Sequence, residues 1–539
     1  PEGQHIISPN GPNVIVRSGA DPSKAMAYTE HTADVQVAKF SPSGKYVASG
    51  DKSGRVRAWA WTHPDHILKN ETIALGGPVS DLAWGFESKR IAAVGGGSSK
   101  AKVFMFDTGS SLGEVIPLSK TANTVDMKPG RPMRAVWGGE DHELQFYAGP
   151  PFKYTCGLKE HTNFVNCVRY SPSGDRFVSV SSDRQGIVYD GKTAEILGRL
   201  DAGGMHSGSV YHCAWSPDGA RLVTSGGDKT LRIWDMASMG LIKAITVGST
   251  VSDMQNSVTW GPAGIVSLSL NGSLNYFDPD GEDSPTRVIQ GHNDPVIAFG
   301  FDADSGRMFS VCGGGVVCSW ARLSEAGDAF EASVTGGPQH SKRGSGLAIA
   351  GGMVATTSWD NTLRVVDIAS GDAVSSTGVG GQPRGVAANP AAPAFRVVIT
   401  NSFIKVFNGE AEASETAAPF VPTCVTVAAN GTNVAVGGED KKVHFFTLAA
   451  DGALAADGES SECAGNVTCV AFAPDSASLA VGDAQREVWL FNTETKERMN
   501  ASRWQSHTTR VTGLAWRPSG THFVTVSTDR RLCIWDPAA

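Results

Sequence analysis

One stretch of 30 residues constrains the fold of this chain most strongly, because its pattern recurs almost from end to end. The stretch, His206–Asp235, reads HSGSVYHCAWSPDGARLVTSGGDKTLRIWD. Apolar and polar residues alternate over 210–215, a Pro-Asp-Gly turn follows, and residues 221–225 and 230–234 form two more strand-like runs. The pattern predicts a small antiparallel sheet that is repeated along the chain.

Four residues of this stretch have a spacing that predicts a buried hydrogen-bond network. His206 would bridge Asp228, while Thr224 and Trp234 would add a hydroxyl group and an indole N–H. A buried carboxylate is tolerated only where its oxygens accept hydrogen bonds, so the network is expected to stabilise the sheet and to have no catalytic role. The same pattern predicts networks of this kind at two further groups of residues: His161, Ser179 and Asp183, and His507, Thr525, Asp529 and Trp535.

A residue that matches Trp234 recurs every 39 to 47 residues. These positions are Trp59, Phe106, Tyr147, Tyr189, Trp234, Phe277, Trp320, Val366, Phe407, Phe446, Phe491 and Trp535. The Asp or Asn six residues earlier is present in eight of the twelve repeats. His31 keeps the histidine spacing, but Ser53 stands where the acid is expected. A period of about 40–45 residues with a closing aromatic residue is typical of a WD-repeat β-propeller, in which each repeat forms one four-stranded blade.

The number of repeats predicts two rings. Residues 5–18 and 25–29 read as a thirteenth, partial blade, and rings typically close with four to eight blades. We therefore expect an all-β fold of two propellers, an N-terminal one over 1–289 and a C-terminal one over 290–539, the second one blade short of seven. Four segments rich in Ala, Gly and Glu read as loops between blades: 324–346, 371–385, 409–419 and 448–461.

Composition and motifs argue against several classes of function. The net charge of −8 gives no whole-chain attraction for nucleic acid or anionic membrane. The nine cysteines are scattered without metal-binding spacing, and no apolar run approaches the roughly 20 residues of a membrane span, which favours reduced thiols and the cytosol. His63 and His66 lack a third metal ligand, and Gly95–Lys100 lacks the pattern of a phosphate-binding loop. We expect no catalytic residues, no metal and no cofactor.

Several segments of the first 300 residues are more specific than the repeat itself. They include GPPFK followed by EHTNFVNCVR within Gly149–Phe177, and GSTVSD over Gly248–Asp253. In these segments the chain resembles the family of actin-interacting protein 1, the WD-repeat cofactor of ADF/cofilin. The resemblance implies two seven-bladed propellers and a protein of the cytoplasm and cytoskeleton. It also implies binding to actin filaments that carry ADF/cofilin, followed by their disassembly or barbed-end capping without catalysis.

The resemblance also implies where partners bind. The family's surface lies largely on the first propeller and uses acidic and aromatic residues, and the matching positions here are Glu140, Asp141, Phe152, Tyr154 and Phe164. Without the family, Phe152 and Tyr154 lie on one face of an outer strand, where packing between blades is an equal alternative. Asp141 also holds the position of a structural turn acid.

Two other classes of function remain open at this point. A generic WD-repeat scaffold in another multiprotein complex would share every structural feature above. An enzyme would have to place its site in irregular loops, because the recurring His and Asp residues are assigned to structural networks.

Overall fold

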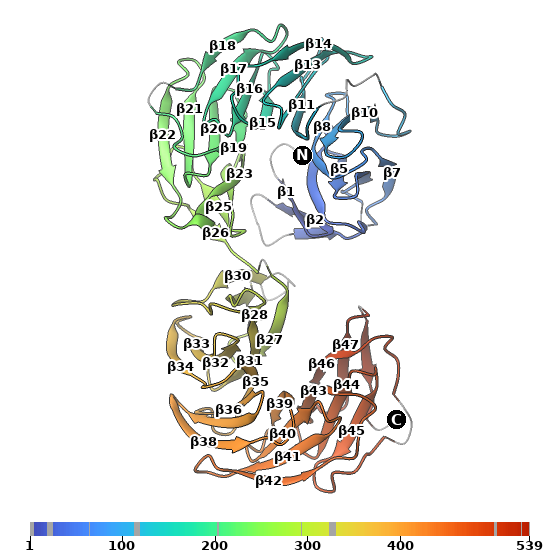
Figure 1. Cartoon of the computed structure of the whole chain (residues 1–539), viewed down its shortest axis with the longest axis vertical. Coiled ribbons are helices and arrows are strands. Elements are labelled where there is room, and N and C mark those ends of the chain that lie inside the picture. Colours follow the sequence, from blue (N-terminus) through green and yellow to red (C-terminus); the bar gives the residue numbers. More distant parts are fainter. Residues whose placement is uncertain are drawn as a thin grey trace. The chain divides into compact units, whose positions relative to one another are not determined.

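The computed structural model describes residues 5–18, 25–63, 65–112, 119–201, 204–292, 294–322, 330–500, 504–529 and 531–537. These ranges contain 48 strands and one 3₁₀ helix, η1 (Val251–Asp253), and no α-helix. The chain divides into two compact units, unit 1 (Pro1–Ile289) and unit 2 (Gln290–Ala539). Every pairing between neighbouring strands of a sheet is antiparallel, and the strands of each sheet follow one another in chain order (Figure 1). The prediction of an all-β fold built from repeated blades is confirmed.

Unit 1 contains seven sheets in the residues that the structure describes. Five have four strands, and the first and third have three. Sheet by sheet, the strands are β1 (His5–Asn10), β2 (Asn13–Ser18) and β3 (Ala25–Tyr28); β4 (Val35–Phe40), β5 (Tyr46–Asp51), β6 (Arg55–Ala60) and β7 (Leu68–Ile73); β8 (Val79–Trp84), β9 (Arg90–Gly95) and β10 (Ala101–Met105); β11 (Ala122–Met127), β12 (Arg134–Gly139), β13 (Leu144–Ala148) and β14 (Lys153–Leu158); β15 (Val165–Tyr170), β16 (Arg176–Ser181), β17 (Gly186–Asp190) and β18 (Ile196–Arg199); β19 (Val210–Trp215), β20 (Arg221–Gly226), β21 (Thr230–Asp235) and β22 (Leu241–Thr246); β23 (Gln255–Gly261), β24 (Gly264–Ser269), β25 (Leu274–Phe277) and β26 (Arg287–Ile289).

Unit 2 contains six sheets in its described residues, and the last two have three strands each. The strands are β27 (Val296–Asp302), β28 (Arg307–Cys312), β29 (Val317–Arg322) and β30 (Phe330–Val334); β31 (Gly344–Ala350), β32 (Met353–Ser358), β33 (Thr362–Asp367) and β34 (Ala373–Gly378); β35 (Pro383–Ala388), β36 (Phe395–Thr400), β37 (Phe403–Asn408) and β38 (Ala411–Ala417); β39 (Pro422–Val427), β40 (Asn433–Gly438), β41 (Val443–Leu448) and β42 (Leu454–Glu459); β43 (Val467–Phe472), β44 (Ser478–Asp483) and β45 (Val488–Asn492); β46 (Val511–Trp516), β47 (Phe523–Ser527) and β48 (Leu532–Trp535).

The core of each unit lies between neighbouring sheets. The second strand of most blades is buried along nearly its whole length, as in β20 and β32, because it has a strand on each side and a sheet against each face. Between the fifth and sixth sheets, the side chains of Val178, Leu222 and Trp234 form one hydrophobic cluster. The stacked sheets therefore form a rigid support for the short segments at the ends of their inner strands.

The prediction that four segments form loops between blades is wrong. Each contains the outermost strand of a blade, namely β30, β34, β38 and β42. These strands pair on one side only, and β38 and β42 are exposed over most of their residues. An outer strand needs no apolar face, so its composition resembles that of a loop.

Candidate interaction site on unit 1

The predicted network around His206 is present and buried. Nδ1 of His206 lies 3.0 Å from Oδ1 of Asp228, and Nε2 lies 2.8 Å from Oγ1 of Thr224. The indole N–H of Trp234 donates to the same Thr224 hydroxyl oxygen at 3.0 Å. The network connects the segment before β19 to β20, to the turn before β21 and to β21 itself, and it holds the blade together.

The other predicted networks form in the same way. His161 lies 2.8 Å from Asp183 and 2.7 Å from Ser179. His507 lies 3.1 Å from Asp529 and 2.9 Å from Thr525, and the indole N–H of Trp535 donates to Thr525 at 2.7 Å. These histidines and aspartates contact one another inside their blades, which leaves them unsuited to bind a partner.

Two further networks differ from the predicted spacing. Nδ1 of His31 lies 3.0 Å from Oδ2 of Asp51. The spacing predicted the acid at position 53, which is Ser53, so the actual acid comes two residues earlier. His340 binds Asp360 across 20 residues instead of 22, with Nδ1 and Oδ2 at 3.1 Å. The acid can stand at the end of the second strand of a blade, as Asp51 does, or in the turn after that strand, as Asp360 does. A search with one fixed spacing between the histidine and the acid therefore detects only some of the networks.

Because of these networks, the free energy of unfolding should fall in two steps on acidification. Burial lowers the pKa of His31 and His340 below 6.5, so below about pH 6.5 the unfolded chain binds protons that the folded chain resists. Burial alone would raise the pKa of Asp183. The hydrogen bond and charge interaction with His161, together with the backbone N–H groups of Gln185 and Thr162, outweigh burial and hold this pKa at about 2. Its contribution is present above about pH 4 and lost between about pH 4 and 2.

Urea unfolding measured from pH 8 down to pH 3 would test this expectation. A His340→Gln variant lacks the titrating ring, so its upper step should be smaller than that of the unaltered chain. Constant stability between pH 7 and 5 would contradict the assignment of buried neutral histidines.

A second buried network joins neighbouring sheets of unit 1 and was not anticipated from the sequence. Asp81 on β8 lies 2.7 Å from Nζ of Lys39 on β4 and 3.0 Å from Nη1 of Arg169 on β15. The Thr124 hydroxyl group donates to Asp81 at 3.1 Å, and Nη2 of Arg169 lies 3.0 Å from Nε2 of His212. Burial would raise the pKa of Asp81, but Arg169 and Lys39 hold it well below its usual range. The network therefore fixes the inner strands of five sheets.

Three of the candidate partner-binding residues lie at the same end of two neighbouring sheets of unit 1. Glu140 follows β12, and its backbone N–H donates to the carbonyl group of Thr121, just before β11, at 3.0 Å. Phe164 directly precedes β15, is 42% exposed, and its ring lies 5.6 Å from that of His142. Glu140, Asp141, His142 and Phe164 are called the unit 1 rim below.

Asp141 has the most structural role of the rim residues. The hydroxyl group of Ser119, which is 22 residues earlier, lies 3.5 Å from Oδ2 of Asp141 and takes the place of the blade histidine. The ammonium group of Lys100 donates to the Ser119 carbonyl group at 2.8 Å and helps to hold Ser119 in place. Glu140 and Phe164 are therefore the stronger candidates for contact with a partner.

The structure corrects the assignment of Phe152 to the partner surface. Its side chain is completely buried in a cluster with Trp137 and Tyr147, so packing accounts for the aromatic residue at this position. Tyr154 on β14 is 43% exposed and pairs with Tyr147 on β13, with ring centroids 5.7 Å apart. Tyr147 follows His142 by five residues, roughly 15 Å of extended backbone, so the Tyr154 backbone beside it lies away from the unit 1 rim.

Neither a metal centre nor a membrane span was found in the described part of the chain. No group of three or more His, Cys, Asp or Glu side chains within it is placed to hold a metal ion. No helix among the described residues is long and apolar enough to cross a membrane. The unit 1 rim offers carboxylates and an exposed aromatic ring on a rigid support, a combination suited to protein recognition.

Comparison with known proteins agrees with the fold. The family model of the WD domain, G-beta repeat, matches residues 23–60, 152–190, 204–235 and 500–536. With its thirteen described sheets, the chain is a WD-repeat β-propeller protein.

Full-length relatives define the family more narrowly. The chain is 35% identical to actin-interacting protein 1 of Drosophila melanogaster over 100% of its own length and 87% of the relative's. It is 34% identical to the 66 kDa stress protein of Physarum polycephalum and 35% identical to WD repeat-containing protein 1 of Gallus gallus, in both cases over 99% of this chain and 88% of the relative. The chain belongs to the family of actin-interacting protein 1 and WD repeat-containing protein 1.

Proposed function

We propose that this protein regulates actin without catalysis, by binding ADF/cofilin-decorated filaments and promoting their disassembly or barbed-end capping. The observation that carries the proposal is the similarity over the whole chain to a relative named for its interaction with actin. The proposal places the protein in the cytoplasm, in association with the cytoskeleton. It includes no cofactor and no binding to nucleic acid or membranes.

The mechanism is a linkage between two binding equilibria. If the protein binds cofilin-bearing actin more tightly than bare actin, the difference in affinity shifts filaments toward the state that it binds better. No bond has to be made or broken in the protein. A rigid blade edge suits this role, because little conformational entropy is lost when it binds.

The unit 1 rim supports the proposal by its chemistry. Phe164 presents an exposed ring, and Glu140 places a carboxylate on the next sheet. Exposed aromatic residues at the centre of an interface commonly contribute about 2 kcal/mol or more, and a neighbouring acid steers a basic surface into place. We assign the main contact to these two side chains.

Sedimentation of actin filaments tests the proposed function. Filaments would be incubated alone, with cofilin, with this protein, and with both proteins, and the actin left in the supernatant would be measured. We expect an increase beyond that caused by cofilin only when both proteins are present. Disassembly by this protein alone would contradict the linkage mechanism.

A scaffold in an unrelated complex is the alternative function. It predicts that the protein pellets with neither bare nor decorated filaments. In that case a pulldown from cell extract should recover partners without actin or cofilin. Recovery of actin and cofilin together would support the proposed function over this alternative.

Tyr154→Ala is expected to weaken binding to decorated filaments by about fivefold, roughly 1 kcal/mol. The effect should be smaller than that at the unit 1 rim, because part of the Tyr154 ring already packs on Tyr147. Tyr154→Phe keeps the ring and serves as the control. Co-sedimentation at increasing protein concentration would give the affinities, and an unchanged affinity for Tyr154→Ala would assign this residue to packing alone.

A further inference from the structure

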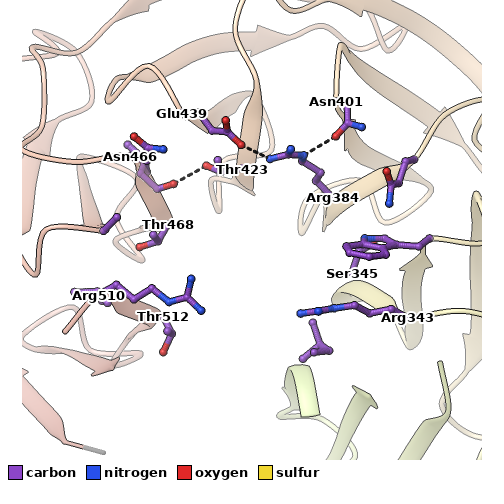
Figure 2. Close-up of a pocket in the computed structure, with 17 residues that line it drawn as sticks. Arg343, Ser345, Arg384, Asn401, Thr423, Glu439, Asn466, Thr468, Arg510 and Thr512 are labelled. Carbon is purple, nitrogen blue, oxygen red and sulfur yellow. Dashed lines mark hydrogen bonds and ion pairs between the residues drawn. The ribbon is translucent and has the colours of Figure 1, made fainter. Parts of the chain in front are cut away.

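Unit 2 has a cavity at the ends of its inner strands that the proposed function does not use. It has a volume of about 720 Å³ and is lined by residues at the starts of the inner strands β27, β31, β35, β39, β43 and β46, or just before them (Figure 2). Residues that follow the second strands, such as Trp359 and Glu439, complete its wall. All six sheets of unit 2 contribute, each with one to four residues, so the cavity exists only in the assembled unit.

The cavity is positively charged in a chain whose net charge is −8. Three arginines line it, Arg343, Arg384 and Arg510, against one acid, Glu439. Arg384 is already engaged, since its Nη1 lies 2.7 Å from Glu439 and its Nε donates to the Asn401 side chain at 2.6 Å. The remaining two arginines therefore carry the excess charge.

Arg343 and Arg510 face each other across the cavity. Arg343 directly precedes β31 and Arg510 directly precedes β46, and Figure 2 shows their guanidinium groups pointing toward one another with open space between them. Both residues are exposed, and neither makes an ion pair with a carboxylate in the part of the chain that the structure describes. Like charges that share one cavity repel, so an anionic group placed between them would be stabilised by both.

The other lining residues favour a peptide over a compact polyanion. Trp359 is 42% exposed and lies under Arg343, with the guanidinium carbon 5.2 Å from the ring centroid, so the pair can receive an apolar or aromatic side chain. The exposed side chains of Gln382 and Asn466 offer hydrogen bonds that match backbone N–H and C=O groups.

We propose that this cavity of unit 2 is a binding site for an acidic peptide segment of a partner protein. Carboxylates of the segment would pair with Arg343 and Arg510, and an apolar side chain would pack on Trp359. The site is separate from the unit 1 rim, so the inference does not depend on cofilin-dependent binding. It would give the protein a second point of attachment to a complex.

Fluorescence anisotropy with the full chain tests the proposal. The probe is a fluorescein-labelled peptide Asp-Glu-Phe-Asp-Glu, and its neutral counterpart Asn-Gln-Phe-Asn-Gln is the matched control. We expect the acidic peptide to bind at least about tenfold more tightly. Arg343→Ala combined with Arg510→Ala should lower its affinity at least about tenfold, while Lys at both positions should retain most of the binding.

Arg517→Ala is the control variant, because this exposed arginine lies just past the opposite end of β46 from Arg510. It should bind the acidic peptide as tightly as the unaltered chain. Both cavity arginines are exposed, so replacing them should not change the thermal unfolding temperature. The single variant Arg510→Gln removes one of the two charges and should also weaken binding of the acidic peptide. Equal affinity for the two peptides would overturn the proposal, as would an unchanged double variant. Binding of inositol hexakisphosphate but not of the acidic peptide would replace it with a small-anion site.

Discussion

Trp234→Ala is expected to destabilise unit 1 by about 3–5 kcal/mol, the largest stability effect of any substitution considered for this chain. The indole ring is 1% exposed and packs in the cluster between the fifth and sixth sheets, so truncation leaves a cavity. It also removes the N–H that donates to Thr224 at 3.0 Å. The free energy of unfolding is lost through packing and through the network together.

Hydrogen exchange followed by mass spectrometry would measure this loss. Amides of β19–β22 should exchange at least about a hundredfold faster in Trp234→Ala, whereas those of unit 2 should be unchanged. Trp234→Phe keeps most of the ring but removes the donor, and should cost about 1–2 kcal/mol. If the two variants had equal effects, the network rather than packing would dominate. Unchanged exchange in Trp234→Ala would contradict the structural role of the repeat.

Phe164→Ala is expected to weaken binding to cofilin-decorated filaments by about thirtyfold, or about 2 kcal/mol. The ring is 42% exposed and contributes little to the core, so the melting temperature should stay nearly the same. Adding Glu140→Ala should bring the total loss to about a hundredfold or more, because the two side chains lie on adjacent sheets of one rim.

Co-sedimentation with decorated filaments would give these affinities. Phe403→Ala on β37 is the matched control, since this phenylalanine is 38% exposed but lies in unit 2, outside the unit 1 rim. Its affinity should equal that of the unaltered chain. Unchanged binding by the Phe164→Ala and Glu140→Ala double variant would remove the unit 1 rim from the proposal.

The repeated blades could be predicted from the sequence because their inner and middle strands are buried. β20 is buried at five of its six residues, and Trp234 and Asp228 recur at a fixed spacing because several blades are held by the same kind of internal network. The outer strands escaped prediction for the opposite reason. β42 is exposed at five of its six residues, so no apolar pattern marks it.

Contacts between blades could not be predicted in this way. Asp81 and Arg169 are 88 residues apart, and their pairing depends on which inner strands face the middle of unit 1. Arg343 and Arg510 are likewise single residues in different repeats, without any motif. For the candidate partner surface, the family resemblance pointed to five positions. The structure separated buried Phe152 from exposed Phe164, a distinction that depends on how the sheets pack.

The most direct test of the proposed function is the ratio of two dissociation constants, one for cofilin-decorated and one for bare actin filaments. Linkage requires these constants to differ, because a ligand with equal affinity for both states does not shift the equilibrium between them. We expect at least about tenfold tighter binding to decorated filaments, a difference of about 1.4 kcal/mol. Equal affinities, or tighter binding to bare filaments, would contradict the account.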